Sequence, residues 1–313
     1  MGKRSPSSEV VEKGCGKGQK SRHSIPPPHL CPPPPKPWVP WLMRLVFFTN
    51  VAMFVYTMYV NNRPTTEEKC ILPFLKRFSY QPWKESPLFG PATLTLKKLG
   101  ALEKQLMAEW GKGWRLFSCM WLHAGVVHLL AHMLSLLFIG IRLEQEFGFI
   151  RIGFLYVLAG LGGSLGSTLH LMRTASPTIS VGASGALFGL LGAMLSELLI
   201  NWTIYVKKFT ARPIVMAVIA VNLAVGFIPK VDSSAHIGGL FTGFFLGFIN
   251  LVRPLYGYIS SKHLPSTYEG KRKSRHMFYQ YVLGITAFII LVLGYTYAFG
   301  NLYGLQALKN VLF

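Results

Sequence analysis

Residues 182–203 read GASGALFGLLGAMLSELLINWT, and this stretch decides the fold. Glu197 is its only charged residue, and its length is close to the ~20 residues that a helix needs to span the hydrocarbon of a bilayer. We expect a helix, because a helix satisfies its own backbone hydrogen bonds in lipid. The stretch begins with Gly182-Ala183-Ser184-Gly185, and a polar side chain in such a segment is costly enough to be a functional hypothesis.

Six other apolar runs of similar length occur along the chain, so we predict seven transmembrane helices. They cover residues 38–60, 116–140, 149–172, 183–203, 212–229, 234–253 and 278–299. Hydrophobic residues make up 51% of the chain and charged residues 14%, whereas a soluble protein carries about 25% charged residues. The predicted fold class is therefore all-α, a polytopic membrane protein with a six-helix core and one further C-terminal transmembrane helix.

The segments outside these runs differ from them in composition. Residues 1–37 are basic and then proline-rich, ending in IPPPHLCPPPPKP, which predicts a disordered or polyproline tail. The predicted organisation is a tail at 1–37, a six-helix core at 38–255 that contains a long loop at 61–115, a basic linker at 256–277, a seventh helix at 278–299 and a short C-terminal tail at 300–313.

The chain has a net charge of +20 at pH 7, and its Lys and Arg residues gather outside the apolar runs. They are concentrated in the N-terminal tail and in the second-to-third, fourth-to-fifth and sixth-to-seventh connections. Positive charge accumulates on the cytosolic side of a membrane protein, so these segments and the N-terminus are predicted to be cytosolic. No nucleic-acid partner is expected, because the basic stretches are short and juxtamembrane, which fits contact with anionic lipid of the bilayer.

A second polar motif, Ala235-His236-Ile237-Gly238-Gly239, starts the sixth predicted helix. Helices two, four and six run in the same direction, so Ser184 and His236 are predicted to lie toward the same membrane face. A serine hydroxyl needs a base to become a nucleophile, and a neutral imidazole suits that role near neutral pH. We therefore predict Ser184 as nucleophile and His236 as general base, with Phe188, one turn after Ser184, stacked on the His236 ring.

Small residues provide the close approach that this pair needs. Gly239 and Gly243 form a stripe on the sixth helix that continues to Gly247, and Gly185 begins a similar set on the fourth. Small residues let helix backbones come together in lipid. No carboxylate is obviously placed to orient His236, because Glu197 lies about 20 Å along the helix from Ser184, and this favours a Ser–His dyad over a triad.

Three histidines, His123, His128 and His132, fall within the second predicted helix and toward the same face. His128 and His132, one turn apart, are candidate oxyanion donors together with free backbone N–H groups at the start of the fourth helix, and Gly182 is assigned to the same pocket. A metal site is the alternative, but no carboxylate or cysteine completes one. The cysteines have neither C-x-x-C nor zinc spacing, so no metal, cofactor or structural disulfide is predicted.

Together these motifs resemble the rhomboid intramembrane serine proteases, over about residues 38–299. The motif G-x-S-G of that family matches Gly182 to Gly185, A-H-x-x-G matches Ala235 to Gly239, W-R in the first loop matches Trp114-Arg115, and H-A-x-x-x-H-x-x-x-N matches His123, Ala124 and His128. The helix after the six-helix core is similar to the secretase-type arrangement of eukaryotes. The stretch GWRLFSCMWLHAGVVHLLA is similar to plant rhomboid-like proteins.

The resemblance implies a serine endopeptidase that cleaves transmembrane helices of single-pass membrane proteins, in the Golgi or plasma membrane of the secretory pathway. In the family, an Asn, the preceding His (here His128) and the serine backbone N–H hold the oxyanion, but this chain has His132 in place of the Asn. The alternative is therefore a weak or inactive pseudoprotease that binds membrane clients. A transporter would carry charges deep in several spans and a repeat of helix patterns, and the chain has no such repeat.

Overall fold

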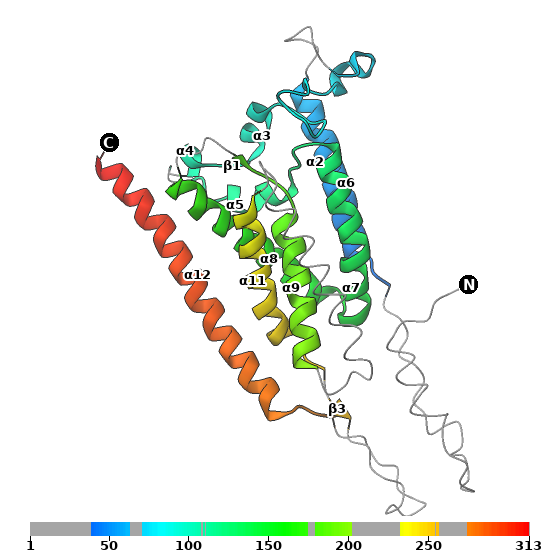
Figure 1. Ribbon diagram of the computed structural model, residues 1–313, viewed down its shortest axis with the longest axis vertical. Coiled ribbons are helices and arrows are strands. Elements are labelled where there is room, and N and C mark those ends of the chain that lie inside the picture. The colour runs from blue at the N-terminus through cyan, green and yellow to red at the C-terminus, as the bar shows by residue number, and fades with distance from the viewer. Residues whose placement is uncertain are drawn as a thin grey trace, which may run out of the picture.

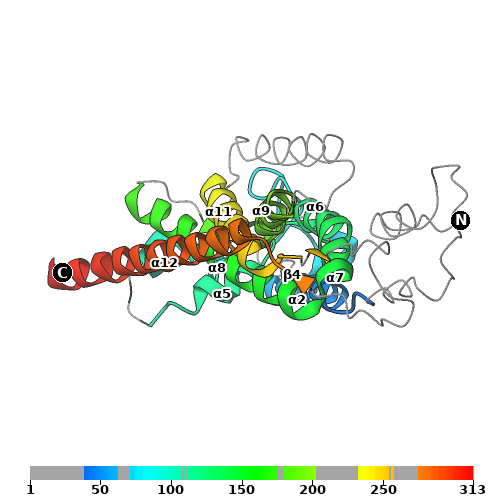
Figure 2. The same ribbon diagram turned by 90° about the horizontal axis from the view of Figure 1, so that it is seen from below.

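The computed structural model describes residues 39–62, 71–107, 109, 111–174, 179–201, 232–253, 255–256 and 274–312. Long helices that run up and down dominate this part of the chain (Figure 1). They are α2 (Leu42–Asn61), α6 (Val126–Ser135), which continues through the π-helix η5 (Leu136–Gly140) into α7 (Ile141–Phe147), α8 (Phe149–Arg173), α9 (Ser184–Ile200), α11 (Ser233–Asn250) and α12 (Phe278–Leu312). Seen from below, α12 extends away from the other helices on one side of the bundle (Figure 2).

Short elements lie at the two ends of the bundle. They are η3 (Pro73–Phe78), α3 (Thr93–Leu99), β1 (Leu102–Glu103), α4 (Lys104–Met107), α5 (Arg115–Ser118), η4 (Cys119–Trp121) and β2 (Ile179–Ser180) at the upper end of Figure 1, and β3 (Leu255–Tyr256) with β4 (Ser274–Arg275) at the lower end. Strands β1 and β2 pair antiparallel, with Leu102 opposite Ser180. This pairing joins the segment between α2 and α6 to the residues that lead into α9.

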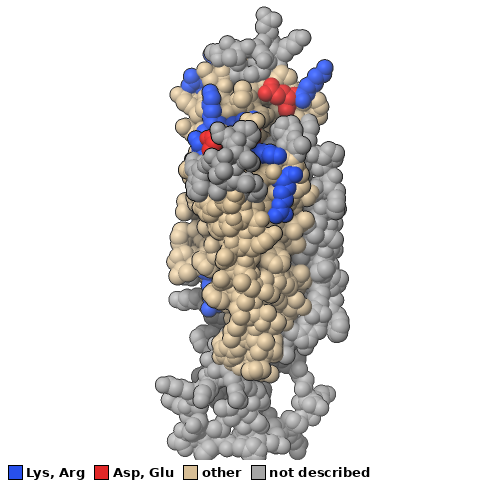
Figure 3. Space-filling view, turned by 90° about the vertical axis from the view of Figure 1, so that its left-hand side faces the viewer, with Lys and Arg blue, Asp and Glu red and all other residues tan. Residues whose placement is uncertain are grey.

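Four described helical segments are long and apolar enough to cross a membrane: Leu42–Asn61, Val126–Phe147, Phe149–Arg173 and Phe278–Gly304, and α9 is a shorter apolar helix. On the face drawn in Figure 3, charged side chains gather mainly toward the upper end, above a broad uncharged surface. The predicted all-α polytopic membrane fold is confirmed. The predicted span 212–229 lies outside the described residues, and the domain boundaries stay predictions.

The second span begins later than the sequence indicates. One continuous helix was expected from residue 116, but residues 116–121 belong to the short helices α5 and η4, residues 122–125 are not helical, α6 starts at Val126 and the span ends at Phe147. The reason is close backbone packing: Val126 N–H donates to Phe89 O over 3.0 Å, and a Cβ on Gly125 would lie 2.1 Å from Leu88 O. A chain pressed this closely against residues 88–89 enters the span as an extended segment, and the helix starts after it.

Glycines bring α8, α9 and α11 into backbone contact at the centre of the bundle. A Cβ added to Gly239 would lie 1.9 Å from Gly185 O, and one added to Gly243 would lie 2.0 Å from Gly189 O. Neither position can hold a larger residue unless the helices separate. This contact is the close approach that the glycine stripes of the sequence predict.

Buried carboxylates hold the lower end together. Glu144 accepts hydrogen bonds from Leu42 N (2.9 Å) and Met43 N (2.8 Å), which satisfies two free N–H groups at the start of α2. Arg253 forms ion pairs with Glu146 (2.6 Å) and Glu197 (3.2 Å). Glu197 is therefore neutralised at the end of α9 opposite Ser184, where it supports packing between helix ends.

Candidate active site

Ser184 is the first residue of α9, and it is 8% exposed. The backbone leading to it passes through Gly182, whose φ of +128° lies in the region that favours glycine. Gly182 N–H donates to Cys119 O over 2.9 Å, so this amide is occupied and ties the loop to η4. The contribution of Gly182 to the pocket is its conformation and its lack of a side chain.

The imidazoles of His128 and His132 lie directly beside Gly182. A Cβ at Gly182 would be 3.0 Å from Cε1 of each ring and 3.3 Å from His128 Nε2. The two ring centroids are 4.1 Å apart. The structure thus places both predicted oxyanion donors of α6 against the residue that lies two positions before Ser184.

The hydrogen bonding of His128 fixes which of its nitrogens is a donor. Ala124 N–H donates to His128 Nδ1 over 3.3 Å, so Nδ1 is the acceptor and the proton of the neutral ring is on Nε2. Nε2 lies, with Cε1, on the side of the ring next to Gly182. His128 therefore presents an N–H donor toward the start of α9.

His236 lies in the first turn of α11, is 6% exposed, and stacks on Phe188 of α9 with ring centroids 4.1 Å apart and planes inclined by 15°. The neighbours of the two candidate residues are also close: a Cβ on Gly185 would be 3.5 Å from Ala235 O. Nδ1 of His236 is buried and has no hydrogen-bond partner among the described residues. No described carboxylate therefore binds the imidazole as the acid of a triad would.

His123 departs from its predicted place. It lies in the segment between η4 and α6 instead of within the second span, because α6 starts only at Val126. Its ring is fully buried, with its centroid 5.5 Å from that of His128 and 5.2 Å from that of His132. Among the described residues, no group of three or more His, Cys, Asp or Glu side chains is arranged to hold a metal ion.

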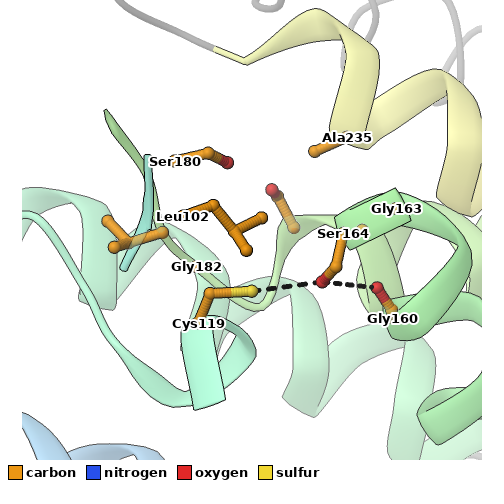
Figure 4. Close-up of a pocket in the computed structure, with 11 residues that line it drawn as sticks. Leu102, Cys119, Gly160, Gly163, Ser164, Ser180, Gly182 and Ala235 are labelled. Carbon is orange, nitrogen blue, oxygen red and sulfur yellow. Dashed lines mark hydrogen bonds between the residues drawn. The ribbon is translucent and has the colours of Figure 1, made fainter. Parts of the chain in front are cut away.

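A small pocket opens beside Ser184, between α8, η4 and the loop before α9, and its water-accessible volume is about 10 Å³ (Figure 4). Its polar lining includes Cys119 and Ser164, whose Sγ and Oγ atoms are 3.1 Å apart, and Ser164 also donates to Gly160 O over 3.0 Å. The remaining lining near Ser184 is small, with Gly163 and Ala235. A pocket of this size has room for about one water molecule. Sequence reasoning missed it, although Ser164 is a polar residue within a span.

Trp114 and Arg115 support the site from a distance. Arg115 donates from Nη1 to Lys97 O (2.8 Å) and Ala101 O (2.9 Å), and its guanidinium lies 4.9 Å from the centroid of the Trp114 ring. Burial lowers the pKa of the Arg115 guanidinium, and Glu103 and Glu109 act in the opposite direction. These bonds fix the end of α3 next to β1, which in turn pairs with β2 ahead of Ser184.

Asp232 is a polar residue of the site that sequence reasoning missed. It caps α11: its Oδ1 accepts from Ser234 N and Ala235 N, each over 3.1 Å, and its Oδ2 accepts a hydrogen bond from Ser167 of α8. An aspartate immediately before an apolar helical run is a recognisable cap signal. Ser167, its partner on α8, cannot be recognised as a partner from the sequence.

Comparison with known proteins agrees with this architecture. A family model described as Rhomboid domain matches residues 111–253. RHOMBOID-like protein 5 of Arabidopsis thaliana is 50% identical over 100% of this chain and 99% of its own length. Rhomboid protease GluP of Bacillus subtilis (strain 168) is 40% identical over 49% of this chain and 29% of its own length, and Inactive RHOMBOID-like protein 8 of Arabidopsis thaliana is 38% identical over 74% and 64%. With a relative that matches along nearly the whole of both chains, and with a polytopic helical fold, this chain belongs to the rhomboid family.

Proposed function

We propose that this protein is an intramembrane serine endopeptidase, in which Ser184 is the nucleophile and His236 the general base. The observation that carries the proposal is the meeting of α9 and α11 at their first turns. The ring of His236 is stacked on Phe188, one turn after Ser184 on the same helix. A buried serine at a helix start, beside an imidazole held in a fixed orientation, is the arrangement that activates a hydroxyl.

The chemistry follows from these positions. His236 takes the proton of Ser184 Oγ as the oxygen attacks the carbonyl carbon of the scissile peptide. The oxyanion is stabilised by Nε2–H of His128, by His132 and by free backbone N–H groups at the start of α9. The imidazolium then gives its proton to the leaving amine. Water, deprotonated by His236, hydrolyses the acyl-enzyme to a carboxylate and restores Ser184.

We place the substrate among the transmembrane helices of single-pass membrane proteins. The residues that react lie at the upper end of an apolar bundle, so a substrate reaches them through the bilayer. An intact helix shields its carbonyl groups, so the scissile segment unwinds before it is cut. The pocket beside Ser184, lined by Gly163, Ser164 and Ala235, favours a small side chain near the cut. The site of action is a secretory-pathway membrane, Golgi or plasma membrane, with the N-terminus in the cytosol.

Two observations support a second candidate, a pseudoprotease that binds clients without cutting them. His132 stands where proteases of the family have Asn, and one relative bears the name Inactive RHOMBOID-like protein 8. Loss of one oxyanion donor costs about 10²–10³ in rate. Against this candidate, Ser184 and His236 are both present, and a neutral His132 keeps one N–H that can donate.

Co-expression with a tagged single-pass substrate distinguishes the two. We expect the wild type to release a fragment, and we expect Ser184→Ala and His236→Ala to release none while being expressed in equal amount. His132→Asn is the discriminating variant: a wild type that binds substrate without cutting it, together with a His132→Asn variant that cuts, would identify a pseudoprotease. If the wild type cuts, and Ser184→Ala cuts equally well, the serine mechanism is wrong.

A further inference from the structure

Asp232 uses both oxygens of its carboxylate in the fold around His236. Oδ1 accepts from the backbone N–H groups of Ser234 and Ala235, and Oδ2 accepts from the hydroxyl of Ser167. One side chain therefore fixes the first turn of α11 and ties that turn to α8. Glycine makes the tie possible, because a Cβ on Gly166 would lie 2.9 Å from Ser234 O.

His236 lies one turn after Asp232, and its backbone N–H donates to Asp232 O over 3.4 Å. The Asp232 carboxylate accepts from N–H groups of the same first turn that carries His236, so it lies within about one helical turn of the imidazole. The other titratable groups that interact with His236 in the described residues are His128 and His132 of α6. A neighbouring histidine ring that can itself become a cation disfavours the imidazolium form of His236. Among Asp232, His128 and His132, Asp232 is therefore the group that favours it.

The position of His236 makes this charge important. The N-terminal end of a helix carries a positive partial charge, and it disfavours a cation in its first turn. A general base must become a cation when it takes the serine proton. An aspartate cap offsets the helix charge at the place where the imidazolium forms, whereas a neutral cap such as Asn or Ser would hold the helix equally well without doing so.

We propose that Asp232 is a positioning residue for His236, which anchors the first turn of α11 to α8 through Ser167 and supplies, through space, the negative charge that a triad would supply by a hydrogen bond. The inference rests on the proposed protease function. It assigns to the cap a role beyond helix stability, and it gives His236, whose Nδ1 has no described partner, a nearby anion that favours the imidazolium.

The test uses the full-length protein in lipid nanodiscs and two readouts over pH 5–9, a range chosen about the ordinary pKa of histidine. One readout is the rate at which a fluorescent fluorophosphonate labels Ser184, and the other is kcat and KM for a tagged transmembrane substrate. Asp232→Asn removes the charge and keeps the cap. Ser167→Ala removes the tie and keeps the charge. Glu109→Gln, which removes a charge from the exposed segment before α5, is the matched control.

For Asp232→Asn we expect the acid limb of both pH profiles, that of the labelling rate and that of kcat, to move to lower pH by about 0.5–1 unit. The reason is that the imidazolium loses a neighbouring anion. The plateau should fall by about 3- to 10-fold, because the imidazolium formed in the transition state is less stable. KM and the thermal unfolding midpoint should stay close to those of the wild type. Ser167→Ala should lower the plateau and leave the acid limb in place, and Glu109→Gln should match the wild type throughout.

An acid limb and a plateau that are unchanged in Asp232→Asn would overturn the inference and leave the protease function standing. Absence of fluorophosphonate labelling in the wild type at every pH would overturn the protease function, and the inference with it. If Asp232→Asn does not fold, Asp232→Ser, which is likewise neutral and capping, is expected to give the same shift. Asp232→Glu should restore the acid limb of the wild type, and failure to do so would count against a role for charge.

Discussion

Substitution of Gly239 by alanine tests whether the active site depends on backbone contact between α9 and α11. The added Cβ would lie 1.9 Å from Gly185 O, whereas ordinary contact begins at 3.4 Å, so the two helices must separate by about 1.5 Å. Gly185 is adjacent to Ser184, and Gly239 is three residues after His236. The separation therefore increases the distance between the Ser184 hydroxyl and the His236 imidazole.

A displacement of about 1 Å between reacting groups can reduce a rate by about 100-fold. Overpacking of this kind also destabilises a protein by about 1–3 kcal/mol. We expect Gly239→Ala to label with a fluorophosphonate about 100-fold more slowly than the wild type, and to unfold at a lower temperature while being expressed and inserted. Alanine is otherwise a better helix former than glycine, so local propensity works against the expected loss.

Gly294→Ala on α12 is the matched control, because an added Cβ there meets nothing within 4 Å. It should label like the wild type and unfold at the same or a slightly higher temperature, because alanine favours the helix. A folded Gly239→Ala protein that labels within twofold of the wild type would refute the reasoning, since it would show that the site tolerates separation of the helices.

Two further substitutions test individual contacts of the structure. Phe188→Leu keeps an apolar side chain but removes the ring on which His236 is stacked, so kcat should fall by about 2- to 10-fold with KM unchanged; a change in KM alone would contradict this role. Glu144→Gln replaces a carboxylate that accepts two backbone N–H groups of α2 by an amide with one acceptor oxygen, so thermal unfolding in detergent should report a loss of about 1–3 kcal/mol with labelling of Ser184 retained; an unchanged unfolding temperature would contradict it.

The membrane fold was predictable because its signals are local. Runs of about 20 apolar residues have one stable solution in lipid, and glycines four residues apart identify the helix faces that meet. The polar motifs around Ser184 and His236 begin their helices, so a count of helix directions is enough to predict that they share a face. For these features, a pattern within one segment carries the information.

The start of the second span was not predictable in this way. Residues 116–131 are mostly apolar and include no Asp, Glu, Lys or Arg, and nothing in that run shows that residues 88–89 press against Gly125 from the other side. The bond between Asp232 and Ser167 has the same origin, because it joins residues 65 positions apart. Contacts between distant segments leave no periodicity in either one, so they became visible only in the structure.

The length of α12 has a consequence for the bilayer. Its apolar part, Phe278–Gly304, has 27 residues and rises about 40 Å along its axis, whereas the hydrocarbon layer is about 30 Å thick. A free helix would relieve this hydrophobic mismatch by adjusting its tilt. Here Tyr279 is bonded to Ile200 O at one end (2.7 Å), and Tyr295 is bonded to Leu158 O further along (2.7 Å), so the lean of α12 is set by the protein. The part of the mismatch that this fixed tilt does not remove therefore falls on the lipids, which must thicken or stretch around this helix.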